Sequence, residues 1–157
     1  MTFQVSHLRR ALFATLAAAA ITGMTAAQAA DDPANVIKYR GSVMKALGGH
    51  IGAIAGVVKG EVSYSGHVAA HAQALHATGL MLSEVFPEGS GEGETRAKPE
   101  IWKDWAKFEG VIKTFNAETE KLAQVAESGD MAAIGAQLGK VGDGCGSCHK
   151  PFRKEKE

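Results

Sequence analysis

Apolar residues recur at alternating spacings of three and four along most of this chain, and no other feature constrains its fold as strongly. Such spacing places apolar side chains on one face of an α-helix. No segment shows the sustained two-residue alternation that is typical of a half-buried strand. The helical pattern occupies residues 37–58, 68–86, 101–122 and 131–152. We therefore predict an all-α fold, an antiparallel four-helix bundle.

Helix-breaking residues separate the four segments. Gly60 follows the first segment, and Asp130 precedes the fourth in the position of an N-cap. Residues 87–99 are rich in glycine and charge and have no apolar pattern, so we expect this loop on the surface. Pro99 is then expected to begin the third helix, and Pro151 to kink or end the fourth.

Residues 1–29 have the layout of a secretory signal peptide. A pair of arginines precedes an apolar run at 12–21, and Ala27 and Ala29 form an A-x-A cleavage signal. The alternative is a transmembrane anchor, but the run is short, rich in alanine and closed by small residues. We predict cleavage after Ala29, a four-helix-bundle domain formed by residues 30–157, and a periplasmic location.

The predicted mature chain is almost neutral. The whole chain has 17 basic and 17 acidic residues, and the signal contains two arginines and no acidic residue, which leaves 15 against 17 and a net charge of −2. It has no basic patch with interleaved aromatic residues, so nucleic acid is not an expected partner. No second apolar segment approaches the length of a membrane span, and we expect a soluble protein.

The two cysteines of the chain, Cys145 and Cys148, lie three residues apart and are followed by His149. C-x-x-C-H is the sequence signature of c-type haem attachment, in which each thiol bonds to a haem vinyl group and the histidine ligates the iron. On a helix, both cysteines share one face, and both fall on the inward side of the fourth segment. The pattern predicts one covalently attached haem c inside the bundle, with His149 as an axial iron ligand.

Other uses of the cysteines fit the sequence less well. A disulfide between them would close a very small loop and would restrict the unfolded chain little. A zinc site formed with His67 and His71 would leave the adjacent His149 unexplained. A thioredoxin-like redox pair normally opens a helix beside a strand, whereas this pair ends a helical chain. His50, His67, His71 and His76 are interpreted as surface or core residues rather than as ligands.

The chain resembles the class II c-type cytochromes, which include cytochrome c-prime. The likeness lies in the C-terminal C-x-x-C-H motif, in the aromatic residue and arginine that follow it, Phe152 and Arg153, and in residues 37–50, 57–61 and 96–102. The resemblance implies an exported four-helix bundle that holds haem and often dimerises through its first two helices. It makes Arg153 a candidate cofactor-binding residue, and it implies that the loop before the third helix approaches the haem edge. The candidates in that loop are Glu94, Thr95 and Arg96.

Arg40 occupies a core-facing position between Ile37 and Met44. An unpaired guanidinium there would be costly, and a haem propionate would supply a bidentate anionic partner. The alternative is an arginine whose stem is buried and whose charged end reaches solvent. The family that the chain resembles has a haem-contacting arginine at the matching position.

Met44 lies four residues after Arg40 on the same helical face, so a haem contacted by one should be covered by the other. A thioether is a suitable sixth iron ligand, and His/Met ligation raises the reduction potential. We therefore expect a single-electron carrier with His149/Met44 ligation that serves periplasmic or membrane-bound redox proteins. The alternative is a five-coordinate haem, as in cytochrome c-prime, that binds nitric oxide or carbon monoxide. Neither function is enzymatic, and a metal-binding or structural bundle without haem is a third, weaker hypothesis.

Overall fold

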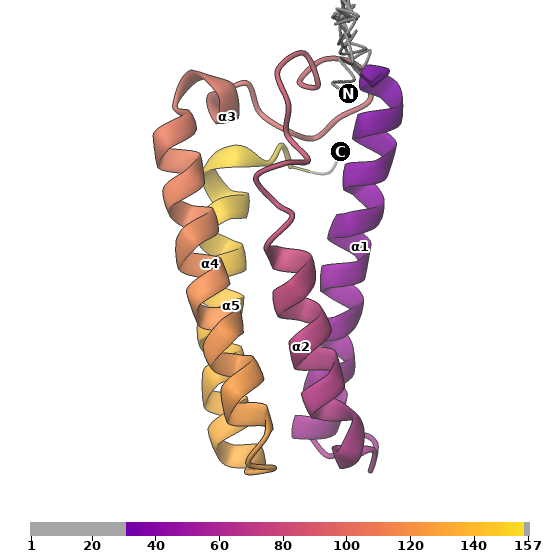
Figure 1. Ribbon diagram of the computed structural model, residues 1–157, viewed down its shortest axis with the longest axis vertical. Helices are drawn as coiled ribbons and strands as arrows, with labels where there is room; N and C mark the ends of the chain where they lie inside the picture. The colour runs from indigo at the N-terminus through magenta and orange to yellow at the C-terminus, as the bar shows by residue number, and fades with distance from the viewer. Residues whose placement is uncertain (1–30, 156–157) are drawn as a thin grey trace, which may run out of the picture. The chain divides into compact units, whose positions relative to one another are not determined.

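The computed structural model describes residues 31–155, so the predicted signal peptide at 1–29 lies outside the described residues. Within them the chain is helical, and the single β feature is an isolated bridge between Ala97 and Arg153. Consecutive long helices alternate in direction, as Figure 1 shows. The predicted all-α, antiparallel four-helix bundle is confirmed. The long helices are α1 (Pro33–Val58), α2 (Val68–Gly79), α4 (Trp105–Ala126) and α5 (Met131–Phe152), and the short ones are η1 (Ser65–His67) and α3 (Glu100–Lys103).

Two aspartates begin the first and last helices. Asp32 caps α1, where its carboxylate accepts a hydrogen bond of 2.8 Å from the Ala34 amide. Asp130 caps α5 in the same way, as the sequence predicts, with an oxygen 2.9 Å from the Ala132 amide. Each carboxylate binds amide groups that have no partner within the helix. At the other end of α1, Gly60 adopts a positive φ of 72°, a conformation that favours glycine.

The predicted second helix is too long. It ends at Gly79 rather than near Phe86. At this residue α2 lies close to α4, since a Cβ atom at Gly79 would lie 2.7 Å from the Asn116 side chain. The chain continues in turns closed by hydrogen bonds over three residues, such as Leu82 N–H to Gly79 O at 3.1 Å. Such turns retain a near-helical spacing, so Leu82 and Phe86 are still buried and continue the apolar pattern.

The predicted third helix is interrupted. Pro99 begins α3 as predicted, but the backbone at Asp104 leaves the helical region (φ −133°, ψ 65°). The Asp104 carboxylate then accepts a hydrogen bond of 3.1 Å from the Lys107 amide and caps α4. At the end of α5, Pro151 lies inside the helix, which ends one residue later at Phe152.

By length and composition, α1 could cross a membrane, since it has 26 residues and a mean hydropathy of 1.3. This corrects the expectation that no second apolar segment reaches that length. Core helices of soluble bundles have the same length and composition. Here α1 packs against α2 and α5 and buries Val43, Leu47 and Ile54 in the common core.

Candidate haem site

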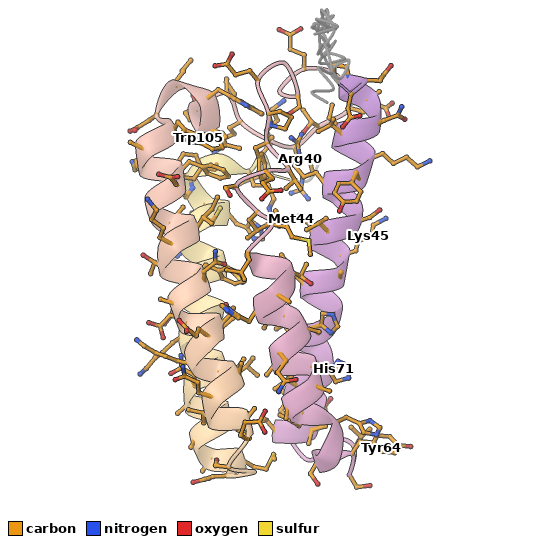
Figure 2. All side chains as sticks on the ribbon, in the orientation of Figure 1. Arg40, Met44, Lys45, Tyr64, His71 and Trp105 are labelled. Atoms are coloured by element: carbon orange, nitrogen blue, oxygen red, sulfur yellow. The ribbon has the colours of Figure 1, made fainter. Side chains whose placement is uncertain are left out.

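A cavity of about 580 Å³ lies between α1, α4, α5 and the segment that joins α2 to α3. Its size is within the usual range of ligand pockets. All nine site residues proposed from the sequence line it, so the fold brings them together from positions more than a hundred residues apart. They are Arg40, Met44, Glu94, Thr95, Arg96, Cys145, Cys148, His149 and Arg153. Figure 2 shows the side chains of Arg40 and Met44 on the inner side of α1.

The end of α5 carries two free, half-buried thiols, Cys145 and Cys148, that pack against the apolar core. Burial raises the pKa of both thiols, that of Cys148 to about 11. A reactive redox cysteine has a lowered thiol pKa, so these thiols do not suit that role. His71 lies beside His50 on the α1–α2 seam and does not join the thiols.

His149 lines the same cavity and is half-buried. Burial lowers the pKa of its imidazole, and the positive charges of Arg153 and Arg96 lower it further. All three effects favour the neutral imidazole, which is the form that ligates a metal. His149 is therefore suited to act as an axial ligand.

Arg40 is 5% exposed, so its guanidinium does not reach solvent and the snorkelling alternative is wrong. One terminal nitrogen, Nη1, donates to Val85 O at 3.3 Å and to Ser90 Oγ at 2.9 Å. The other, Nη2, donates to Ser90 O and Thr95 Oγ1, both at 2.9 Å. The guanidinium carbon also lies 4.7 Å from the centre of the Phe86 ring, a cation–π contact.

No carboxylate forms an ion pair with Arg40 within residues 31–155. Burial lowers the pKa of its guanidinium, and its four hydrogen bonds go to neutral oxygen atoms. A buried cation on the wall of the cavity fits a cofactor that carries carboxylates. Together with the two thiols and the imidazole, it makes the residues present a suitable set for a haem c.

The loop at 87–99 is less exposed than predicted. Ser90 is 1% exposed and Ala97 is 8% exposed. The hydrogen bond from Arg40 to Ser90 Oγ holds the loop against the end of the bundle. Ser90 is the functional residue that sequence reasoning missed. A single serine in a Gly-rich stretch carries no signal of burial. Only the need of a buried Arg40 for hydrogen-bond acceptors could have suggested that such a residue lies nearby.

The loop also pairs with the C-terminal end of the chain. The Lys98 amide donates to Phe152 O at 2.9 Å, and the Lys154 amide donates to Arg96 O at 2.8 Å. The Arg96 guanidinium in turn donates to Lys154 O at 2.7 Å. These bonds hold Arg96 beside His149, and Glu94 remains exposed at the cavity wall.

Comparison with known proteins agrees with this site. The sequence profile of the family described as Cytochrome C' matches residues 35–153. The chain belongs to the cytochrome c-prime family. A cytochrome c' from Rhodospirillum rubrum is 41% identical over 140 residues, which cover 88% of this chain and 95% of that protein.

Solved structures of the family share the fold. A nitric oxide complex of a Leu→Ala variant of cytochrome c prime from Alcaligenes xylosoxidans has a TM-score of 0.75 and 32% identity, and the match covers 81% of this chain and 99% of that one. A carbon monoxide-bound Leu→Gly variant of the same cytochrome has a TM-score of 0.73 and 32% identity, with 79% and 98% covered. Members of the cytochrome c-prime family contain one covalently attached haem c, and this chain is accordingly a c-type haem protein.

Proposed function

We propose that this protein binds a small gas, nitric oxide or carbon monoxide, at the haem iron, and that it senses or scavenges that gas without catalytic turnover. In this proposal Cys145 and Cys148 form the two thioethers, and His149 is the axial ligand. When bound, the haem supplies an iron with one axial position left for a gas. The proposal prefers the gas-binding alternative over the electron carrier expected from the sequence, because related structures contain these gases.

One observation carries the proposal: beyond Arg40, the α1 side of the cavity is apolar except for the exposed Lys45. Ile37, Met44 and Ile51 line it, and the terminal N–H groups of Arg40 donate to Val85 O and to Ser90 and Thr95 of the loop. Hydrogen-bond donors beside the iron favour dioxygen binding and activation. A wall with few such donors suits nitric oxide and carbon monoxide.

A second candidate function is electron transfer, and the position of Met44 favours it. Met44 lines the cavity and is half-buried on the face of α1 that carries Arg40, so its thioether could become a sixth iron ligand. A basic rim also surrounds His149 in a second cavity of about 600 Å³, which would attract an acidic redox partner. This rim is formed by Arg96, Lys98, Lys150, Arg153 and Lys154.

The absorption spectrum of the purified holoprotein separates the two functions. Gas binding predicts a high-spin ferric spectrum and ready carbon monoxide uptake by the reduced protein, both kept in Met44→Leu. A low-spin spectrum with a sulfur-to-iron charge-transfer band and little carbon monoxide uptake would overturn it, provided that Met44→Ala loses both features. Met81→Leu is the matched control, since Met81 is 44% exposed and does not line the cavity.

The proposed setting is the periplasm. Processing after Ala29 predicts a mature protein that begins at Ala30 and carries its haem only after export. N-terminal sequencing of the haem-containing protein tests this. The proposed homodimer is tested separately by size-exclusion chromatography with light scattering, which distinguishes one mature chain from two.

A further inference from the structure

Two histidines meet on the seam between α1 and α2. His50 Nδ1 lies 3.1 Å from His71 Nδ1, and the ring centres are 5.4 Å apart with the ring planes inclined by 52°. Both side chains are half-buried. Figure 2 shows His71 where α1 and α2 run side by side. Neither histidine lines the haem cavity.

Buried residues one helical turn away hold both imidazole rings in place. On α1, His50 lies one turn from Leu47 and Ile54, and both of these are buried in the core. On α2, His71 lies one turn from Val68 and Leu75, which are 1% and 0% exposed. Residues at these spacings share a helix face, so each imidazole lies beside the packed seam. The site is thus preorganised by side chains that cannot easily move.

The separation of the two nitrogens is that of two ligands on one metal ion. Imidazole nitrogens lie about 2.0–2.1 Å from zinc. At that bond length, a nitrogen–nitrogen distance of 3.1 Å corresponds to an N–metal–N angle of about 100°. That angle is intermediate between the square-planar and tetrahedral values, so a small change in the N–metal–N angle would give either geometry.

We propose that His50 and His71 form a bidentate site for a borderline divalent transition-metal ion such as Zn²⁺, Cu²⁺ or Ni²⁺, whose remaining positions are filled by water. Imidazole is a preferred ligand of these ions. Across residues 31–155, no group of three or more His, Cys, Asp or Glu side chains converges on a metal position, so the protein supplies two ligands here.

The chemistry of the pair is simple. Without a metal, one Nδ1 carries a proton and donates it in a hydrogen bond to the other. With a metal, both Nδ1 atoms present lone pairs, and each ring carries its proton on Nε2. Because the ion joins α1 to α2 in the folded state, its binding should stabilise the protein against unfolding.

The test uses the holoprotein, whose thiols are consumed by the haem, and ZnCl₂ as the probe. Isothermal titration should give one Zn²⁺ per chain, and zinc should raise the melting temperature. His50→Gln and His71→Gln should each weaken binding by about tenfold or more, because one of two ligands is lost. The control is His67→Gln, since His67 is exposed and stacks on Tyr64 instead.

A measurement on the unaltered protein keeps the test independent of how the variants fold. Electron paramagnetic resonance of the ferric holoprotein with one equivalent of Cu²⁺ should show hyperfine coupling to two imidazole nitrogens, after subtraction of the spectrum recorded without copper. The haem absorption spectrum should not change on metal addition, which separates this site from the haem site. Equal zinc affinity in all three variants, or a copper signal with fewer than two nitrogens, would overturn the proposal.

Discussion

Replacement of Arg40 by leucine tests how the cavity is held together. If only the core-facing position of residue 40 is considered, leucine should be tolerated there. The structure predicts a larger effect, because the guanidinium donates three hydrogen bonds to the loop and a fourth to Val85 O. The effect should appear as a lower free energy of unfolding of the holoprotein.

The magnitude follows from the acceptors that Arg40 leaves behind. Ser90 Oγ still donates to Pro87 O at 2.7 Å, and Thr95 Oγ1 still accepts from the Ala97 amide at 3.1 Å, so the two hydroxyls keep a partner. The carbonyls of Val85 and Ser90 lose the donor that the structure gives them. Each unsatisfied buried acceptor costs about 1–3 kcal/mol, so the pair costs about 1–5 kcal/mol after a gain of about 1 kcal/mol from a buried leucine.

Urea unfolding followed by circular dichroism measures this loss. Lys38→Leu is the matched control, since Lys38 is exposed on the same helix and its replacement removes the same charge. Limited proteolysis should also cut within residues 87–99 much faster in Arg40→Leu than in the control. Equal unfolding free energies for the two variants, within about 0.5 kcal/mol, would refute the argument that Arg40 holds the loop.

Two further predictions concern α5. Cys145→Ser and Cys148→Ser should each retain at most one thioether, and the double variant none, as measured by intact mass and by acid–acetone extraction of the haem; an unmodified polypeptide from a host with attachment machinery would contradict covalent attachment. Gln137 Nε2 donates to Glu118 Oε2 at 2.7 Å, and this bond, followed by one from Lys121, holds the pKa of Glu118 below its usual value of about 4.3. A carboxyl group with a lower pKa in the folded state stabilises the fold above its unfolded-state pKa, and this stabilisation is lost as the pH falls through its folded-state pKa. Gln137→Met should therefore cost more stability at pH 7 than at pH 3. Equal losses in urea unfolding at both pH values would contradict this prediction.

The helices could be predicted because their signal is local and repeated. Asp130 shows this most directly, since its cap depends on residues only two and three positions away. The end of α2 could not be predicted in this way. Its last residue, Gly79, lies close to Asn116 of α4, and no pattern within residues 68–86 indicates this contact. The apolar spacing continues through the turns that follow, so the sequence alone reads them as helix.

The candidate site residues could be proposed from the sequence because their chemistry is specific. The C-x-x-C-H motif defines the cofactor, and Arg40 is conspicuous as a charge in an apolar series. The role of Met44 could not be decided in this way. Ligation and steric blocking require the same residue at the same place, and they differ only in whether sulfur approaches the iron to bonding distance. Spectroscopy measures that difference directly.

The loop at 87–99 connects what the sequence presents as separate features. Arg40 fastens the loop to α1 through Ser90 and Thr95, and the amides of Lys98 and Lys154 fasten it to the end of α5. The first and last helices are therefore joined across the mouth of the cavity by one segment without an apolar pattern. Since the attachment motif lies on α5 and the buried cation on α1, this segment fixes the separation of the two groups between which the proposed haem would lie.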